Sequence, residues 1–156
     1  MLNDSLNGHP GRIAGGVNLD GVFVGLALSD GLGAGDKSFL IWVPPSGPDN
    51  ITNWDEWWNT TGKLDRADWQ KELSIANSTQ GTYSDFPLVV DISGYRQVDP
   101  KAVDAAFGTI NGVRSTSILT TYISDFFDMA LKGEKEPLLI GPSESYPEVS
   151  FLRSST

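Results

Sequence analysis

Two polar positions in this sequence follow apolar runs, where the catalytic groups of open α/β sheets are found. Asp20 comes where the apolar run that starts near Ile13 ends, and Gly21 after it eases a sharp turn. Ligands and catalytic groups of open α/β sheets gather at the carboxyl ends of strands. Asp20 is therefore a candidate catalytic acid, although most aspartates at strand ends cap a turn or a helix. The second position, Gln80, lies in a polar loop after another apolar run.

The other parts of a serine hydrolase are missing from the 156 residues. Such an enzyme of the α/β-hydrolase kind carries its nucleophile in Gly-X-Ser-X-Gly, followed by an acid and a base. No such pattern occurs, and the segment GPSES at Gly141 lacks the second glycine. The only histidine, His9, precedes the first predicted strand, whereas Asp20 follows it. A strand of about seven residues separates the two by on the order of 20 Å, and a triad needs a direct hydrogen bond.

Gln80 cannot act as the missing base, because an amide does not take up a proton near neutral pH. With one histidine and no cysteine, the sequence predicts no zinc site and no cofactor site. The segment GLGAGDKS resembles a phosphate-binding loop only superficially. Asp36 separates its last glycine from Lys37, and the segment precedes a predicted strand instead of following one.

The elements that must position these residues can be predicted from apolar runs. A strand is expected from near Ile13 to near Asp20, a second in KSFLIWVPP, and a weaker third in KELSIANS. Runs of this kind are typical of a parallel sheet that is covered on both faces.

The helices have clear boundary signals. Asp99 and Pro100 favour a helix start, and a helix with a broad apolar face is expected over 115–132, with Gly133 as its end. The proline-interrupted tail, 136–152, is expected to run extended over the surface.

Four tryptophans mark the segment between the second and third predicted strands. Trp54, Trp57 and Trp58 are spaced to lie on one face of a helix, and Trp69 follows. This spacing favours packing in the core. The alternative is a platform on which sugars or lipids stack.

The composition is that of one globular domain, with 39% hydrophobic and 20% charged residues. The net charge of −9 argues against nucleic acid, whose binding needs Lys and Arg, and against anionic membranes. No apolar run is long enough to span a bilayer, and the N-terminus lacks the pattern of a signal peptide. Sequons at Asn3, Asn50, Asn59 and Asn77 are possible N-glycosylation sites and suggest a secreted ancestry.

Several motifs together resemble a known family. RIAGGVNLDG, KSFLIWV, TQGTYSDFPLVVD, INGVRSTSILTTYISDFFDMALKG and PLLIGPSESYPEVSF are similar to the C-terminal half of fungal secreted α/β-hydrolases like platelet-activating factor acetylhydrolase. The resemblance implies that Asp20 occupies the position of the catalytic acid and Gln80 that of the catalytic histidine. It also implies a nucleophile turn some tens of residues before GGVNLDG, and this chain is expected to begin too late to contain it.

We therefore expect one partial α/β-hydrolase domain over residues 1–156, with about three parallel strands and flanking helices. The resemblance implies a carboxylic ester hydrolase of the 1-alkyl-2-acetylglycerophosphocholine esterase or lipase kind, secreted, and acting on a small acyl ester or phospholipid. The chain itself is expected to be inactive, because it has neither the nucleophile turn nor the histidine, so whether it is an enzyme stays open. The alternative is a glycan- or lipid-binding module that uses the tryptophans. An exposed edge of the first strand is expected to favour self-association.

Overall fold

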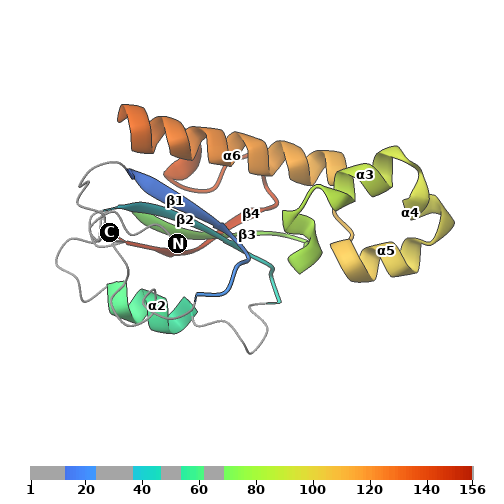
Figure 1. Cartoon of the computed structure of the whole chain (residues 1–156). Coiled ribbons are helices and arrows are strands. Elements are labelled where there is room, and N and C mark those ends of the chain that lie inside the picture. The colour runs from blue at the N-terminus through green and yellow to red at the C-terminus, as the bar shows by residue number, and fades with distance from the viewer. Residues whose placement is uncertain (1–12, 24–36, 47–53, 62–68, 156) are drawn as a thin grey trace.

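The computed structural model describes residues 13–23, 37–46, 54–61 and 69–155. Figure 1 shows a small sheet with helices on both sides. In chain order the elements are β1 (Gly15–Leu19), β2 (Ser38–Val43), α2 (Trp54–Thr61), β3 (Gln70–Ile75), η3 (Gln80–Tyr83), α3 (Phe86–Ile92), α4 (Tyr95–Val98), α5 (Pro100–Phe107), α6 (Gly112–Lys132), η4 (Pro137–Leu139) and β4 (Val149–Ser154).

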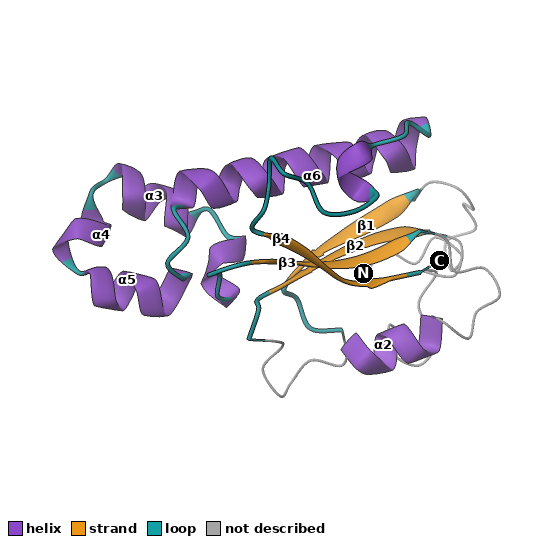
Figure 2. Cartoon of the chain, turned by 180° about the vertical axis from the view of Figure 1, so that it is seen from behind, coloured by secondary structure: helices purple, strands orange, loops and turns teal. Residues whose placement is uncertain are grey.

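The sheet is mixed, with the strand order β1-β2-β3-β4. The three predicted strands pair in parallel, which confirms them, and α6 covers one face while α2 covers the other (Figures 1 and 2). Helices α3, α4 and α5 lie beyond the carboxyl ends of the strands (Figure 1). This arrangement confirms the expected α/β class.

The prediction for the C-terminal tail was wrong. Residues 136–152 do not simply run over the surface, because Pro137–Leu139 form η4 and Val149–Ser154 form β4. Strand β4 pairs antiparallel with β3 and has an irregularity opposite Glu72 and Leu73. The prolines suggested a tail that runs extended over the surface, but all of them precede β4, so none removes a donor from its ladder.

The larger core lies between the sheet and α6. Leu40, Trp42, Leu73 and Ile75 from the strands pack there with Ile118, Tyr122 and Phe126 from the helix, all fully or almost fully buried. The helix begins three residues before the predicted start, because the Asn111 side chain accepts a hydrogen bond from the Arg114 N–H at 3.1 Å. It ends at Gly133, where φ is 71°, as predicted. Asp99 likewise caps α5 through the Ala102 N–H.

The smaller core lies on the other face of the sheet. Trp54 and Trp57 are each 1% exposed and pack with Phe23, Ile41 and Val43. Trp58 is partly buried beside them and donates to the Glu72 carboxylate at 2.7 Å, and Trp69 is partly buried against the larger core. These tryptophans fill the two cores, so none presents a mainly exposed ring for a ligand to stack on. No helix among the described residues is long and apolar enough to cross a membrane.

Candidate active site at the carboxyl edge of the sheet

Asp20 lies directly after β1 in a tight turn. Its φ is 56°, which is uncommon for a residue with a side chain but tolerated by aspartate. The Asn18 side chain fastens the turn, since it accepts from the Gly21 N–H and donates to the Gly21 carbonyl. The Trp54 indole also donates to this carbonyl, at 3.0 Å. The turn holds Asp20 with 8% of its surface exposed at the edge where catalytic groups of such sheets gather.

The loop after β3 brings Gln80 to the same edge. Strand β3 ends at Ile75, Asn77 has a φ of 62°, and η3 begins at Gln80. Within the loop the Thr79 N–H donates to the Thr82 hydroxyl at 2.8 Å. The Gln80 side chain is exposed and forms no hydrogen bond within the described part of the chain. The two positions predicted from the resemblance thus share one edge of the sheet, whereas His9 lies outside the described residues.

Tyr83 joins the ends of two strands at this edge. Its hydroxyl donates to the Val43 carbonyl at the end of β2 and lies 3.2 Å from the Ser78 hydroxyl. Burial raises the pKa of Tyr83 to about 12, and the charge of Asp20 adds to the same shift, whereas the hydrogen bond to Ser78 opposes it. Tyr83 therefore stays neutral near Asp20 over the physiological pH range.

Helix α5 and the loop after it fix the Gln80 loop from outside. The Thr79 hydroxyl donates to the Ala106 carbonyl at 2.8 Å, and the Thr82 hydroxyl donates to the Phe107 carbonyl at 2.7 Å. Gly108, at a φ of 74°, lies so close to the loop that an added Cβ would be 2.2 Å from the Asn77 carbonyl oxygen. These contacts leave little freedom to the backbone that carries Gln80.

Arg96 connects α5 and the loop after it to the start of α6. Its guanidinium pairs with Asp91 and Asp104 and donates to the Gly108 carbonyl at 3.0 Å. The Asp91 carboxylate also accepts from the Gly112 N–H at the start of α6. The hydrogen bonds to these two carboxylates help raise the pKa of Arg96 above its usual value, although its own burial opposes the shift.

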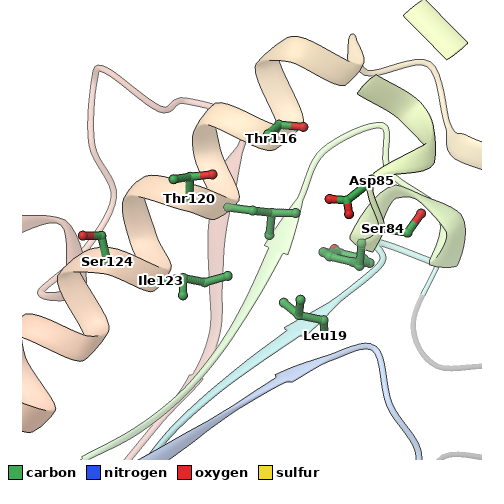
Figure 3. Close-up of a pocket in the computed structure, with 9 residues that line it drawn as sticks. Leu19, Ser84, Asp85, Thr116, Thr120, Ile123 and Ser124 are labelled. Carbon is green, nitrogen blue, oxygen red and sulfur yellow. The ribbon is translucent and has the colours of Figure 1, made fainter. Parts of the chain in front are cut away.

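A cavity of about 390 Å³ opens beside this edge, between α6 and the end of β1. Figure 3 shows hydroxyl groups of α6 along one side, Ser84 and Asp85 across from them, and Leu19 from the sheet. The lining residues are Leu19, Tyr83, Ser84, Asp85, Thr116, Leu119, Thr120, Ile123 and Ser124. An apolar body with a few hydroxyl groups around it suits an acyl group better than a strongly charged one.

Sequence reasoning did not find the residues that hold the loop. Tyr83, Thr79 and Thr82 lie inside the quoted motif, but nothing in their spacing shows that they bond to β2 and α5. Arg96 had a weak signal, because Asp91 and Asp104 flank it in a chain with few basic residues. Of the possible glycosylation sites, Asn59 and Asn77 are exposed, and Asn50 lies outside the described residues.

Comparison with known proteins supports the resemblance. No family model matches the chain. The chain is 40% identical over 146 residues, 91% of its length, to a probable 1-alkyl-2-acetylglycerophosphocholine esterase from Arthroderma benhamiae, of which it covers 38%. The resemblance noted in the sequence is thereby confirmed.

The fold also matches that of a solved esterase. A ferulic acid esterase from Streptomyces cinnamoneus superimposes with a TM-score of 0.71 at 30% identity, over 91% of this chain and 40% of the other. The chain thus spans about two fifths of the length of each of these proteins. In sequence and in fold, this chain is similar to esterases of the α/β-hydrolase kind.

Proposed function

We propose that this chain is the acid-bearing part of a carboxylic ester hydrolase and that, by itself, it does not turn over esters. The observation that carries the proposal is Gln80, which lies exposed at the edge that also holds Asp20. Hydrolysis by a serine triad needs an imidazole that takes the proton of the nucleophile and returns it to the leaving group. An amide can do neither, and Tyr83 beside Asp20 is held neutral.

The names of the similar proteins support the reaction class. One is a probable 1-alkyl-2-acetylglycerophosphocholine esterase and the other a ferulic acid esterase, so an acyl ester or a phospholipid is the proposed substrate class. In that reaction the Asp20 carboxylate would orient an imidazole and stabilise its charged form. Position 80, in the loop after β3, holds a glutamine, which has no imidazole to offer.

The proposal is tested by the rate of release of p-nitrophenol from p-nitrophenyl acetate by the purified chain. We expect no sustained release above that of buffer, and no change in Asp20→Asn. Gln80→His is expected to stay inactive as well, since the sequence has no Gly-X-Ser-X-Gly. Sustained release over many turnovers by the unmodified chain would overturn the proposed inactivity, and its loss in Asp20→Asn would show that Asp20 serves a working site.

Secretion and glycosylation belong to the same proposal. Asn59 and Asn77 are exposed sequon asparagines, so we expect glycans on both when the chain is made in a eukaryotic secretory pathway. Treatment with peptide N-glycosidase should then shift the mass, and Asn59→Gln and Asn77→Gln should each remove one glycan. An unchanged mass would contradict this part. Self-association along the outer edge of β1 stays a prediction. A measurement of the mass of the particle in solution would test it.

A further inference from the structure

The opposite end of the sheet holds a buried amine that the proposed function does not use. Lys71 is the second residue of β3, and its side chain is only 9% exposed. Its side chain lies on the same face of the sheet as that of Leu73, the face covered by α6, and it shares a cavity with Met129 near the C-terminal end of that helix. Lysines are almost never this deeply buried unless they are paired.

Lys71 has no carboxylate partner. Its ammonium donates to the Ser154 hydroxyl at 3.0 Å. It also lies 5.7 Å from the ring centre of Trp69 and 5.3 Å from that of Phe151. Within the described residues no carboxylate lies within 4.0 Å of it, although other cations of the chain, such as Arg96, are paired. Two aromatic faces and one hydroxyl thus take the place of part of the water that surrounds a protonated amine in solution.

Charging the amine at this place is costly. An ammonium without an ionic partner is destabilised by removal from water, and lysines respond by giving up their proton more readily. Burial accordingly lowers the pKa of Lys71. The neutral amine is a nucleophile, whereas the ammonium is not.

The amine also has room for a reactant. It lines a cavity of about 460 Å³ between the sheet and the segment after α6. Trp69, Met129, Leu139 and Ile140 give this cavity apolar walls, and Glu134, Lys135 and Glu136 supply the charged groups along it. Burial and the neighbouring acidic groups raise the pKa of Glu136. A small neutral molecule fits this lining better than an anion.

We propose that Lys71 is a reactive amine that accepts acyl groups from activated esters or thioesters in this cavity. The neutral Nζ attacks the carbonyl carbon of the donor and forms an N–C bond. The bond from that carbon to the leaving oxygen or sulfur then breaks, and the leaving group departs with its electron pair. Nζ loses its extra proton to water, and the product is a stable amide. Each chain therefore accepts one acyl group and does not turn over, so this inference does not depend on the proposed function.

The test is acetylation of the full chain by p-nitrophenyl acetate at neutral pH, followed by peptide mass mapping against time. Lys101, an exposed lysine of α5, is the internal reference. We expect Lys71 to be acetylated several-fold faster than Lys101 at neutral pH. As the pH is raised, the rate at Lys71 should reach its plateau at a lower pH than the rate at Lys101. Lys71→Arg keeps the positive charge and the aromatic contacts, and should lose only the fast site.

Two outcomes would overturn the proposal. One is acetylation of Lys71 at the same rate as Lys101 or more slowly, at every pH from neutral to alkaline. The other is a fast phase of one equivalent that persists in Lys71→Arg. Far-ultraviolet circular dichroism of Lys71→Arg and of Lys71→Met shows whether each variant is folded. The internal ratio of Lys71 to Lys101 in the unmodified chain decides the question even if both variants fail to fold.

Discussion

The two ends of β3 differ in a way that reverses what the sequence suggests about chemistry. The carboxyl end leads into the loop for which the resemblance implies a catalytic histidine, but Gln80 in it is exposed and cannot exchange protons near neutral pH. The amino end belongs to the weakest of the three strands that the sequence predicts. It holds Lys71, a titratable amine that is buried without a carboxylate partner.

The difference shows that a residue at a catalytic position of a motif need not be able to do the chemistry, whereas a residue outside any motif can be chemically active. The loop at the carboxyl end is fixed by hydrogen bonds from Thr79 and Thr82 to α5 and by the close approach of Gly108. It keeps this fixed geometry although Gln80 supplies no base. At the amino end, burial alone changes the properties of an ordinary lysine, because it disfavours the charged form.

The first prediction tests whether the close approach of Gly108 holds the loop at the carboxyl end of β3. Gly108→Ala would put a Cβ 2.2 Å from the Asn77 carbonyl oxygen at a φ of 74°. The ψ of 174° puts Gly108 in a region that is essentially open to glycine alone. We expect the free energy of unfolding to fall by roughly 3–5 kcal/mol, from overpacking and backbone strain together. Gly133→Ala is the control for a positive φ without crowding, because Gly133 lies in the left-handed region, with a φ of 71° and a ψ of 22°, and nothing lies within 4 Å of its Cβ.

Gly133→Ala should lower the free energy of unfolding by only roughly 1–2 kcal/mol, from backbone strain alone. Denaturant unfolding followed by circular dichroism measures both variants. Equal losses for the two would show that the approach of Gly108 to Asn77 does not hold the loop.

The second prediction concerns Arg96, which connects α5 and the loop after it to the start of α6. Arg96→Ala leaves the buried Asp91 carboxylate without its cation and the Gly108 carbonyl without a donor. We expect a loss of roughly 2–3 kcal/mol of unfolding free energy. Arg96→Lys should recover only part of it, because an ammonium cannot reproduce the fork of the guanidinium. Lys101→Ala, on the exposed side of α5, should stay within about 0.5 kcal/mol, and a similar effect of all three would contradict this role.

The third prediction follows from the raised pKa of Tyr83, which is about 12 against an ordinary 10.0. Folding favours the protonated phenol, so this stabilisation is complete below pH 10 and is lost as the pH rises from 10 to about 12. In Tyr83→Phe, the free energy of unfolding should fall less steeply as the pH rises from 10 to about 12. At neutral pH, this variant should have lost roughly 1–2 kcal/mol of it. Tyr122, whose pKa burial also raises to about 12, should account for part of the remaining slope.

Tyr95→Phe is the control for the phenol series, because Tyr95 is 52% exposed on α4. Its stability should follow that of the unmodified chain from pH 7 to 12, within about 0.5 kcal/mol. If Tyr83→Phe and Tyr95→Phe give the same alkaline profile, the buried hydroxyl of Tyr83 does not fasten the strand ends.

Much of the sheet and of its covering helices could be predicted from the sequence, because the signals are local. Continuous apolar runs indicate buried parallel strands, and Asn111 and Gly133 show how capping residues set the bounds of α6. Strand β4 was missed because its residues pair with residues of β3 that lie 74 to 83 positions earlier in the chain, from Ile75↔Val149 to Lys71↔Ser154. No local pattern encodes such a contact, and the prolines before β4 pointed to a tail that runs extended over the surface.

The site was predictable only in part for the same reason. The resemblance gave Asp20 and Gln80, and the fold brings both to one edge of the sheet. The bonds from Thr79 and Thr82 to carbonyls of α5 join residues about 25 positions apart in sequence. Lys71 gave no signal, since a single lysine in a strand is usually exposed, and its burial depends on Trp69, Phe151 and the chain after α6.

The most direct test of the account is the time course of p-nitrophenol release when p-nitrophenyl acetate is in large excess over the chain. The account predicts a first release of about one equivalent per chain that Lys71→Arg abolishes. In both the unmodified chain and Asp20→Asn it is followed only by the slower release with which other amines, such as Lys101, each react once. Continued release that stops in Asp20→Asn would contradict it, because the carboxyl edge would then hold a working catalytic site without a histidine at position 80.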